Sequence, residues 1–222
     1  MQKFETPAAI ATVLDIPAGN IRFIAADRTD TTVEVLPANA SKSRDVKAAE
    51  QTTVDYRDGI LRINTPSKNQ ILGATGAIEV TVQLPAGSHI EARTASAEFR
   101  GVGRLGDVTL ESAHGTVKLD ETASARLTLA AGDITVGRLG GSAEIRTQKG
   151  DLAIAEAAGG TLDLRTEHGN ISVGAARGVS ASLDAGTSYG RIHNALQNAD
   201  GANAALKIQA TTSYGDITAL SA

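Results

Sequence analysis

The sequence contains no cysteine and no tryptophan, and its aromatic residues are three tyrosines and three phenylalanines. The lack of cysteine excludes disulfide frameworks, thiol nucleophiles and zinc sites made of cysteine. With so few aromatic rings, the core of this 222-residue chain has to be built from Ala, Val, Ile and Leu. Small aliphatic side chains of this kind suit a narrow interior between stacked strands.

Charged residues and apolar residues are not concentrated in long runs. Lys and Arg are scattered, and the formal net charge is only −4, so no basic stripe favours nucleic acid as a partner. No stretch approaches the ~20 apolar residues of a membrane-spanning helix. The N-terminal residues also lack the apolar core of a secretory signal. We therefore expect a cytoplasmic protein without a transmembrane segment.

Glycine is abundant, with 23 residues, and it marks a repeat. The units TEHGNI (from Thr166), TSYGRI (from Thr187) and TSYGDI (from Thr212) share Thr, a Gly three positions later and an aliphatic residue two positions after the Gly. The Gly position recurs at spacings of 18, 17, 18, 19, 21 and 25 residues. It holds Ala97 in the first unit and a turn glycine in the others, Gly115, Gly132, Gly150, Gly169, Gly190 and Gly215.

Apolar and polar residues alternate on both sides of each Gly position, which is typical of two strands joined by a tight turn. Glycine permits the positive φ that such turns require. Antiparallel hairpins in a meander would also fit the pattern. Stacked coils fit it better, because fixed periods usually mean stacked units and an open meander of this width would be rare. The recurring Thr would then form a ladder of hydroxyl groups between coils.

The sequence thus predicts an all-β, single-domain parallel β-solenoid over residues 1–222, with about seven to eight coils of roughly 18 residues. Right-handed crossovers, and hence a right-handed β-helix, are expected for parallel strands. Residues 1–88 are predicted to hold the first coil and a β-rich N-terminal cap, including a hairpin around Asp58-Gly59. Residues 89–222 hold the regular repeats, with a loop insertion at 193–206. Tyr189 and Tyr214 would be neighbours on consecutive coils.

The residue after each turn glycine forms a column of candidate functional residues. Asp133 and Asp151 would face each other one coil apart, with Asn170 above them and Lys149 nearby. Such carboxylates could hold Ca²⁺, or form the acid pair of a polysaccharide lyase or hydrolase. The simpler interpretation is that Asp and Asn bond the local backbone in turns.

Two further groups of residues are candidate sites. Tyr189 and Tyr214 could form a small stacking platform for a sugar or a peptide, or simply fill a turn. His114 and His168 share a position in the repeat but would lie three coils apart, too far to share a metal ion. We expect no metal site, no cofactor and no catalytic residue.

The segments AGNIRF, KAAEQTTVDYRDGILRI and VTVQLPAGS, with the repeated Thr-x-x-Gly-Asp-Ile units, resemble the bacterial "putative adhesin" β-strand-repeat family. This family is a domain of unknown function that is common in actinobacteria. The resemblance covers essentially the whole chain and implies a parallel β-helix-like domain without catalytic residues. Its label alone implies contact with a cell surface or a carbohydrate.

We therefore predict a non-catalytic structural and interaction module, a rigid scaffold that presents a ladder of side chains to an unknown protein partner. Self-association through a face or an end of the solenoid is a further expectation. The alternative is a carbohydrate-active β-helix enzyme, or a calcium-binding protein, that uses Asp133 and Asp151.

Overall fold

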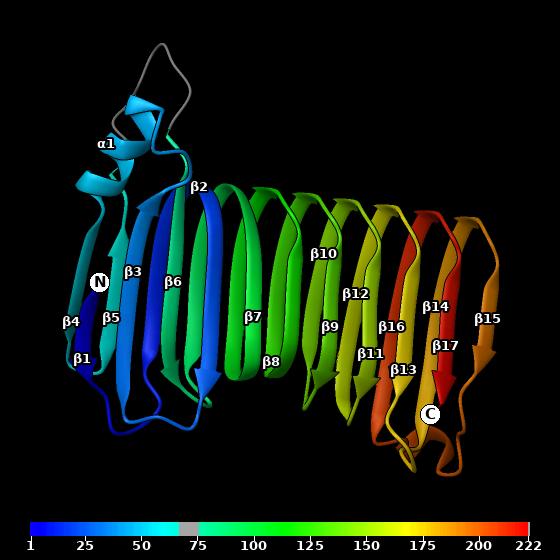
Figure 1. Ribbon diagram of the computed structural model, residues 1–222. Coiled ribbons are helices and arrows are strands. Elements are labelled where there is room, and N and C mark those ends of the chain that lie inside the picture. Colours follow the sequence, from blue (N-terminus) through cyan, green and yellow to red (C-terminus); the bar gives the residue numbers. More distant parts are fainter. Residues whose placement is uncertain (67–75, 222) are drawn as a thin grey trace. The chain divides into compact units, whose positions relative to one another are not determined.

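The computed structural model describes residues 1–66 and 76–221, and almost all of its regular structure is β-strand (Figure 1). The contacts divide the chain into two compact units, Met1–Gly115 and Thr116–Ala222. We call them the first unit and the second unit and describe each by itself. Within the described ranges, no helix is both long enough and apolar enough to cross a membrane.

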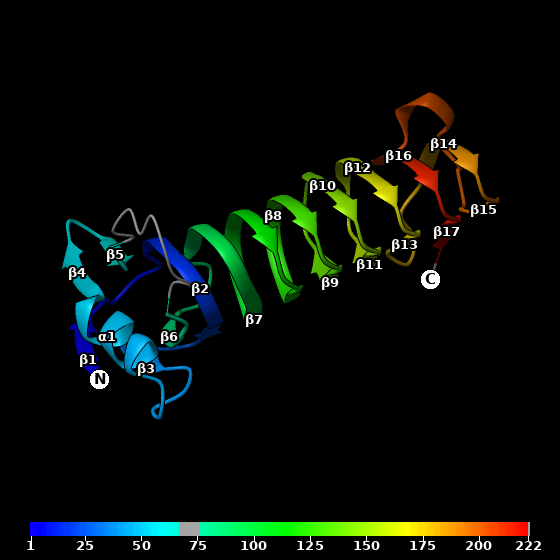
Figure 2. The same cartoon turned by 90° about the horizontal axis from the view of Figure 1, so that it is seen from above.

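The second unit consists of parallel strands joined by the predicted glycine turns. Its strands are β8 (Val117–Ala131), β9 (Ile134–Leu139), β10 (Ala143–Lys149), β11 (Leu152–Ala157), β12 (Gly160–His168), β13 (Ile171–Ala175), β14 (Ala181–Tyr189), β15 (Ile192–Ala195), β16 (Leu206–Tyr214) and β17 (Ile217–Ser221). They form two rows, seen from above in Figure 2. One row runs β8–β10–β12–β16–β14 and the other β8–β9–β11–β13–β17–β15.

Each glycine turn joins a strand of one row to a strand of the other, so the chain forms stacked strand–turn–strand units. The aliphatic residues after the turns pair directly along the second row, with Ile134 on Leu152 and Leu152 on Ile171. The two arms of a unit do not pair with each other among these strands. The predicted parallel stacking in register is confirmed for these strands, and the antiparallel hairpin alternative is wrong for them.

The order of the stack does not follow the order of the chain. The last strands, β16 and β17, lie between the β12–β13 pair and the β14–β15 pair. The loop predicted at 193–206 corresponds to residues 196–205, which include the short 3-10 helix η1 (Gly201–Asn203) and lead back to β16. The inward-facing aliphatic residues of β16 and β17 are at most 1% exposed, namely Leu206, Ile208, Ala210, Ile217 and Ala219, whereas all of β15 is exposed. The more apolar strands therefore take the interior position.

The first unit contains the predicted β-rich cap. Its elements are β1 (Gln2–Glu5), β2 (Ala11–Ala26), β3 (Asp30–Pro37), α1 (Ser43–Gln51), β4 (Thr53–Arg57), β5 (Ile60–Asn64), β6 (Ile78–Pro85) and β7 (His89–His114). β2 pairs in parallel with β5 and β6 on one side and with β7 on the other. β1–β3, β3–β6 and β4–β5 pair antiparallel. The hairpin at Asp58-Gly59 is confirmed, with φ angles of 54° and 77°.

The core of each unit is aliphatic, as the composition predicts. In the second unit Leu127, Ile145, Leu164 and Ala210 lie at successive positions of one row and are each at most 1% exposed. The core of the first unit also contains a buried ring contact, Phe23 on Phe99, with centroids 5.5 Å apart. The all-β class is confirmed, and the described strands form open rows rather than a closed barrel. Handedness, coil number and the single-domain organisation stay predictions.

Candidate functional site

The turns of the second unit are built around glycines that touch the backbone of the neighbouring turn. A Cβ atom on Gly150 would lie 2.1 Å from the carbonyl oxygen of Gly132. On Gly215 it would lie 2.0 Å from that of Gly169, and on Gly190 1.9 Å from that of Gly215. In the first unit a Cβ on Gly115 would lie 1.8 Å from the carbonyl oxygen of Ala97. No side chain fits at these positions, because real Cβ contacts are much longer.

The recurring Thr binds the same carbonyl groups. The hydroxyl of Thr166 donates to the carbonyl oxygen of Gly150 at 3.1 Å, and that of Thr212 donates to Gly169 at 3.0 Å. The Thr187 hydroxyl donates to the Gly215 carbonyl at 3.0 Å. The predicted ladder therefore exists for these three threonines with a different pairing: each hydroxyl bonds a carbonyl of the neighbouring turn, not another hydroxyl. Thr147 instead donates to the carbonyl of Lys149 in its own turn, at 3.3 Å.

Asp133, Asp151 and Asn170 lie in one column, as predicted, and their side chains bind the backbone of the next turn. Oδ1 of Asp133 accepts from the amide of Asp151 at 2.9 Å, and Oδ1 of Asp151 accepts from the amide of Asn170 at 2.7 Å. The series continues in the same way: Oδ1 of Asn170 accepts from the amide of Asp216 at 2.9 Å, and Oδ1 of Asp216 accepts from the amide of Arg191 at 2.8 Å. One oxygen of each side chain is thus used in holding consecutive turns together.

The column does not assemble a metal site in the part of the chain that the structure describes. No group of three or more His, Asp or Glu side chains there is placed to bind an ion. Asp133 and Asp151 are exposed. Lys149 belongs to a different column, that of the residues before the turn glycines, where it lies in register with His168. His89 is in the first unit, where its Nδ1 accepts from the amide of Asp107 at 3.0 Å.

The residues before the turn glycines form a stack of exposed rings. The rings of Tyr189 and Tyr214 are 4.8 Å apart at an interplanar angle of 5°, and those of Tyr214 and His168 are 4.9 Å apart at 11°. We call His168, Tyr214 and Tyr189 the ring ladder. Tyr214 is 50% exposed and Tyr189 68%. The predicted Tyr neighbours are confirmed, and His168 is a third member that was not predicted from the sequence.

The ring ladder presents edges rather than faces to its surroundings. Stacking covers both faces of Tyr214 and one face of each neighbour. His168 and Tyr189, at the two ends of the ladder, each keep one face free of another ring. That of His168 is on the side of Lys149, its register neighbour in β10, whereas that of Tyr189 lies beyond the last strand of its row. A flat sugar ring could therefore stack only at the ends of the ladder, and the row of ring edges is the larger surface.

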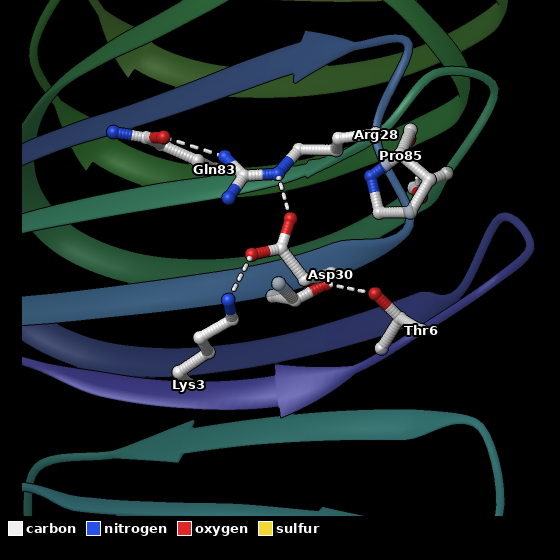
Figure 3. A network of polar contacts seen from close by, with 8 residues as sticks. Lys3, Thr6, Arg28, Asp30, Gln83 and Pro85 are labelled. Atoms are coloured by element: carbon white, nitrogen blue, oxygen red, sulfur yellow. Dashed lines mark hydrogen bonds and ion pairs between the residues drawn. The ribbon is translucent and has the colours of Figure 1, made fainter.

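A separate polar cluster stabilises the strands at the start of the first unit (Figure 3). The carboxylate of Asp30 lies 2.8 Å from Nε of Arg28 and 3.1 Å from Nζ of Lys3. Arg28 also donates a hydrogen bond to Oε1 of Gln83. The hydrogen bonds from Arg28 and then Lys3 lower the pKa of Asp30 from 3.8 to about 2. The cluster links β1, β3 and β6, and its charges are satisfied within it, so its role is structural.

Comparison with known proteins identifies the fold but no activity. The family model described as Toastrack DUF4097 matches residues 12–221. A crystal structure of a "putative adhesin" from Parabacteroides distasonis covers 98% of this chain and 95% of its own, at 13% identity and a TM-score of 0.50. A "putative adhesin" from Bacteroides fragilis covers 99% and 95%, at 14% identity and a TM-score of 0.48. Curated protein sequences give no significant match.

Proposed function

Because the chain belongs to the Toastrack DUF4097 family, we propose that it is a non-catalytic interaction module, a rigid right-handed β-solenoid that presents the ring ladder to a protein partner. The observation that carries this proposal is the stack of His168, Tyr214 and Tyr189, which is ordered and yet exposed. Of the six Phe and Tyr residues in the chain, Tyr189 and Tyr214 are the exposed ones.

The ring ladder is suited to binding because it is already ordered. Each ring precedes a turn that is fixed by a Thr hydroxyl bond or an Asp or Asn bond to the next turn. Side chains that are held in place lose little conformational entropy when a partner binds. Tyr is also among the residues that most often dominate the binding energy of protein interfaces.

An enzyme or a calcium-binding protein is a weaker interpretation of the same residues. A catalytic acid pair needs carboxylates that converge on a cleft, and a calcium site needs several free oxygen ligands. Asp133 and Asp151 are exposed and each uses Oδ1 for a backbone amide. Their geometry supports a structural role between turns, which leaves the rings as the candidate surface.

The proposal is tested by comparative capture of partners from an extract of the source cell. We expect Tyr189→Ala/Tyr214→Ala to lose at least about tenfold in affinity for a captured protein, equivalent to about 1.4 kcal/mol. Lys207→Ala is the matched control, because Lys207 is exposed at the far end of β16. The proposal fails if every captured protein binds the double variant as well as the wild type.

A further inference from the structure

The end of the second unit formed by β14 and β15 is open. In the described part of the chain β14 pairs only with β16, and β15 pairs only with β17, so each has one edge without a strand partner. At the start of β14 this edge is covered by the segment after β15, because the amide of Ala181 donates to the carbonyl of Gln197. Residues that are buried in the other strands are partly exposed here: Leu183 and Ala185 are half-buried, and Ile192 is 47% exposed. Both the backbone and the aliphatic interior are therefore accessible at this end.

The direction of the free backbone groups follows from two hydrogen bonds. The carbonyl of Ser180 accepts from the amide of Leu206 in β16, whereas the amide of Ala181 donates away from β16, to the carbonyl of Gln197. Backbone groups of successive residues alternate in direction along a strand. The amide and carbonyl groups of Leu183, Ala185 and Thr187 consequently point outward from the stack.

This edge has few of the features that usually prevent pairing: one charged side chain, Asp184, and the contact of Gln197 at Ala181. β14 reads ASLDAGTSY and β15 reads IHNA, without Pro, Lys or Glu, the residues that natural edges use as protection. The first unit differs, because antiparallel β1, β3 and β4 and the helix α1 add to its parallel strands. The open end of the second unit is thus suited to a further strand.

We propose that this end binds the same end of a second copy of the chain, with β14 antiparallel to its counterpart. A two-fold axis through Ala185 would place Leu183 opposite Thr187 of the second copy, so that their outward groups exchange hydrogen bonds. Asp184, the one formally charged residue of β14, would lie opposite Gly186, which avoids like-charge contact.

A second copy fits this end better than a single extended peptide. The end has two edges without a strand partner, one in each row, and a peptide strand would cover only one of them. An axis perpendicular to the rows brings β14 onto β14 and β15 onto β15 at the same time. It also covers the half-exposed aliphatic residues with their own counterparts. The substitutions that test this interface change Asp184, Ala185 and Gly186 and none of the rings of the ladder, so either proposal can fail alone.

The first test is the mass of the protein in solution as a function of concentration. We expect the wild type to approach twice 22.7 kDa in sedimentation equilibrium. Ala185→Pro removes an outward amide without touching a bond to β16, and we expect it to stay at 22.7 kDa with an unchanged circular dichroism spectrum. Asp184→Asn is the control and should associate like the wild type. A wild type that is monomeric at every concentration overturns the proposal.

The second test uses the absence of native cysteine and does not depend on the proline variant. Asp184→Cys and Gly186→Cys proteins are mixed under mild oxidation; a Cβ on Gly186 meets nothing within 4 Å. In the proposed register, Asp184 of one copy and Gly186 of the other are directly opposed without backbone hydrogen bonds to each other. Cα atoms of such a pair are ~4.5 Å apart, which is within disulfide range. Asp184 of one copy and Asp184 of the other are diagonal neighbours, ~7–8 Å apart. We expect disulfide-linked dimers in the mixture and little in each variant alone. Equal cross-linking in all three samples overturns the proposed register, and none in any overturns the interface.

Discussion

At the scale of single residues, each letter of the Thr-x-x-Gly-Asp/Asn repeat has a separate physical role in the second unit. Glycine leaves room for the carbonyl group of the neighbouring turn, and Thr donates a hydrogen bond to that group. Asp or Asn accepts the next backbone amide. The repeat therefore describes contacts between turns, and these contacts account for the recurrence of acidic residues after the turn glycines.

Gly150 is the position where this interpretation can be tested. We expect Gly150→Ala to destabilise the protein by about 1–3 kcal/mol or more, because φ is 146° and the new Cβ would meet the carbonyl oxygen of Gly132 at 2.1 Å. Urea denaturation measures the effect. Gly186→Ala is the control, since its Cβ has open space, and should change the free energy of unfolding by less than about 0.5 kcal/mol. Equal effects of the two substitutions would contradict the proposed role of the turn glycines.

At the scale of elements, an electrostatic cluster contributes to the position of one short strand of the first unit. β1 is only four residues long and pairs with β3 alone, so side-chain contacts contribute to its position. Lys3 of β1 and Arg28 meet at Asp30 of β3 (Figure 3). The cluster was not predicted from the sequence, because its members are brought together by antiparallel pairing across a long connection.

This cluster predicts a dependence of stability on pH. The pKa of Asp30 is lowered in the folded state to about 2, from 3.8, so its contribution is complete above pH ~4 and is lost as the pH falls toward 2. We expect Asp30→Asn to lower stability at neutral pH and to flatten the curve between pH 4 and pH 2, measured by thermal unfolding. Asp27→Asn, at an exposed position outside the cluster, should leave the curve unchanged. An unaltered slope in Asp30→Asn would exclude this role.

At the scale of the whole molecule, the notable feature is a stack whose order differs from the chain. In the second unit β16 and β17 are interior although they come last, and in the first unit β2 comes early yet lies between β7 and the pair β5 and β6. Parallel coils are similar in shape, so any of them could be a neighbour of any other. The free energy of burial then decides which coil is covered on both sides.

The order of the stack can be checked with two truncated side chains. Ile208 in β16 is 1% exposed, and we expect Ile208→Ala to cost about 2–5 kcal/mol of unfolding free energy. Leu183→Ala in β14 should cost clearly less, because Leu183 is half-buried at the end. A stack in chain order would reverse this ranking. Chemical denaturation of both variants, at concentrations where the wild type is monomeric, distinguishes the two orders.

The candidate site was partly predictable from the sequence, because its three residues recur at one position of the repeat. The sequence places Tyr189 and Tyr214 at one position of the repeat, and this alone predicts that they are neighbours. His168 occupies that position too, but its distance from Tyr214 along the chain is 46 residues. Only the insertion of β16 next to β12 brings its ring onto Tyr214.

The sequence by itself determined the all-β class, the strands on each side of the turn glycines and their register, because these depend on a local pattern repeated along the chain. It also determined that the core would be aliphatic. The tertiary structure alone decided the order of the coils, the third ring of the ladder and the strands left at the open end. These depend on pairing between distant segments, which is set by how much apolar surface each coil buries and not by any local preference.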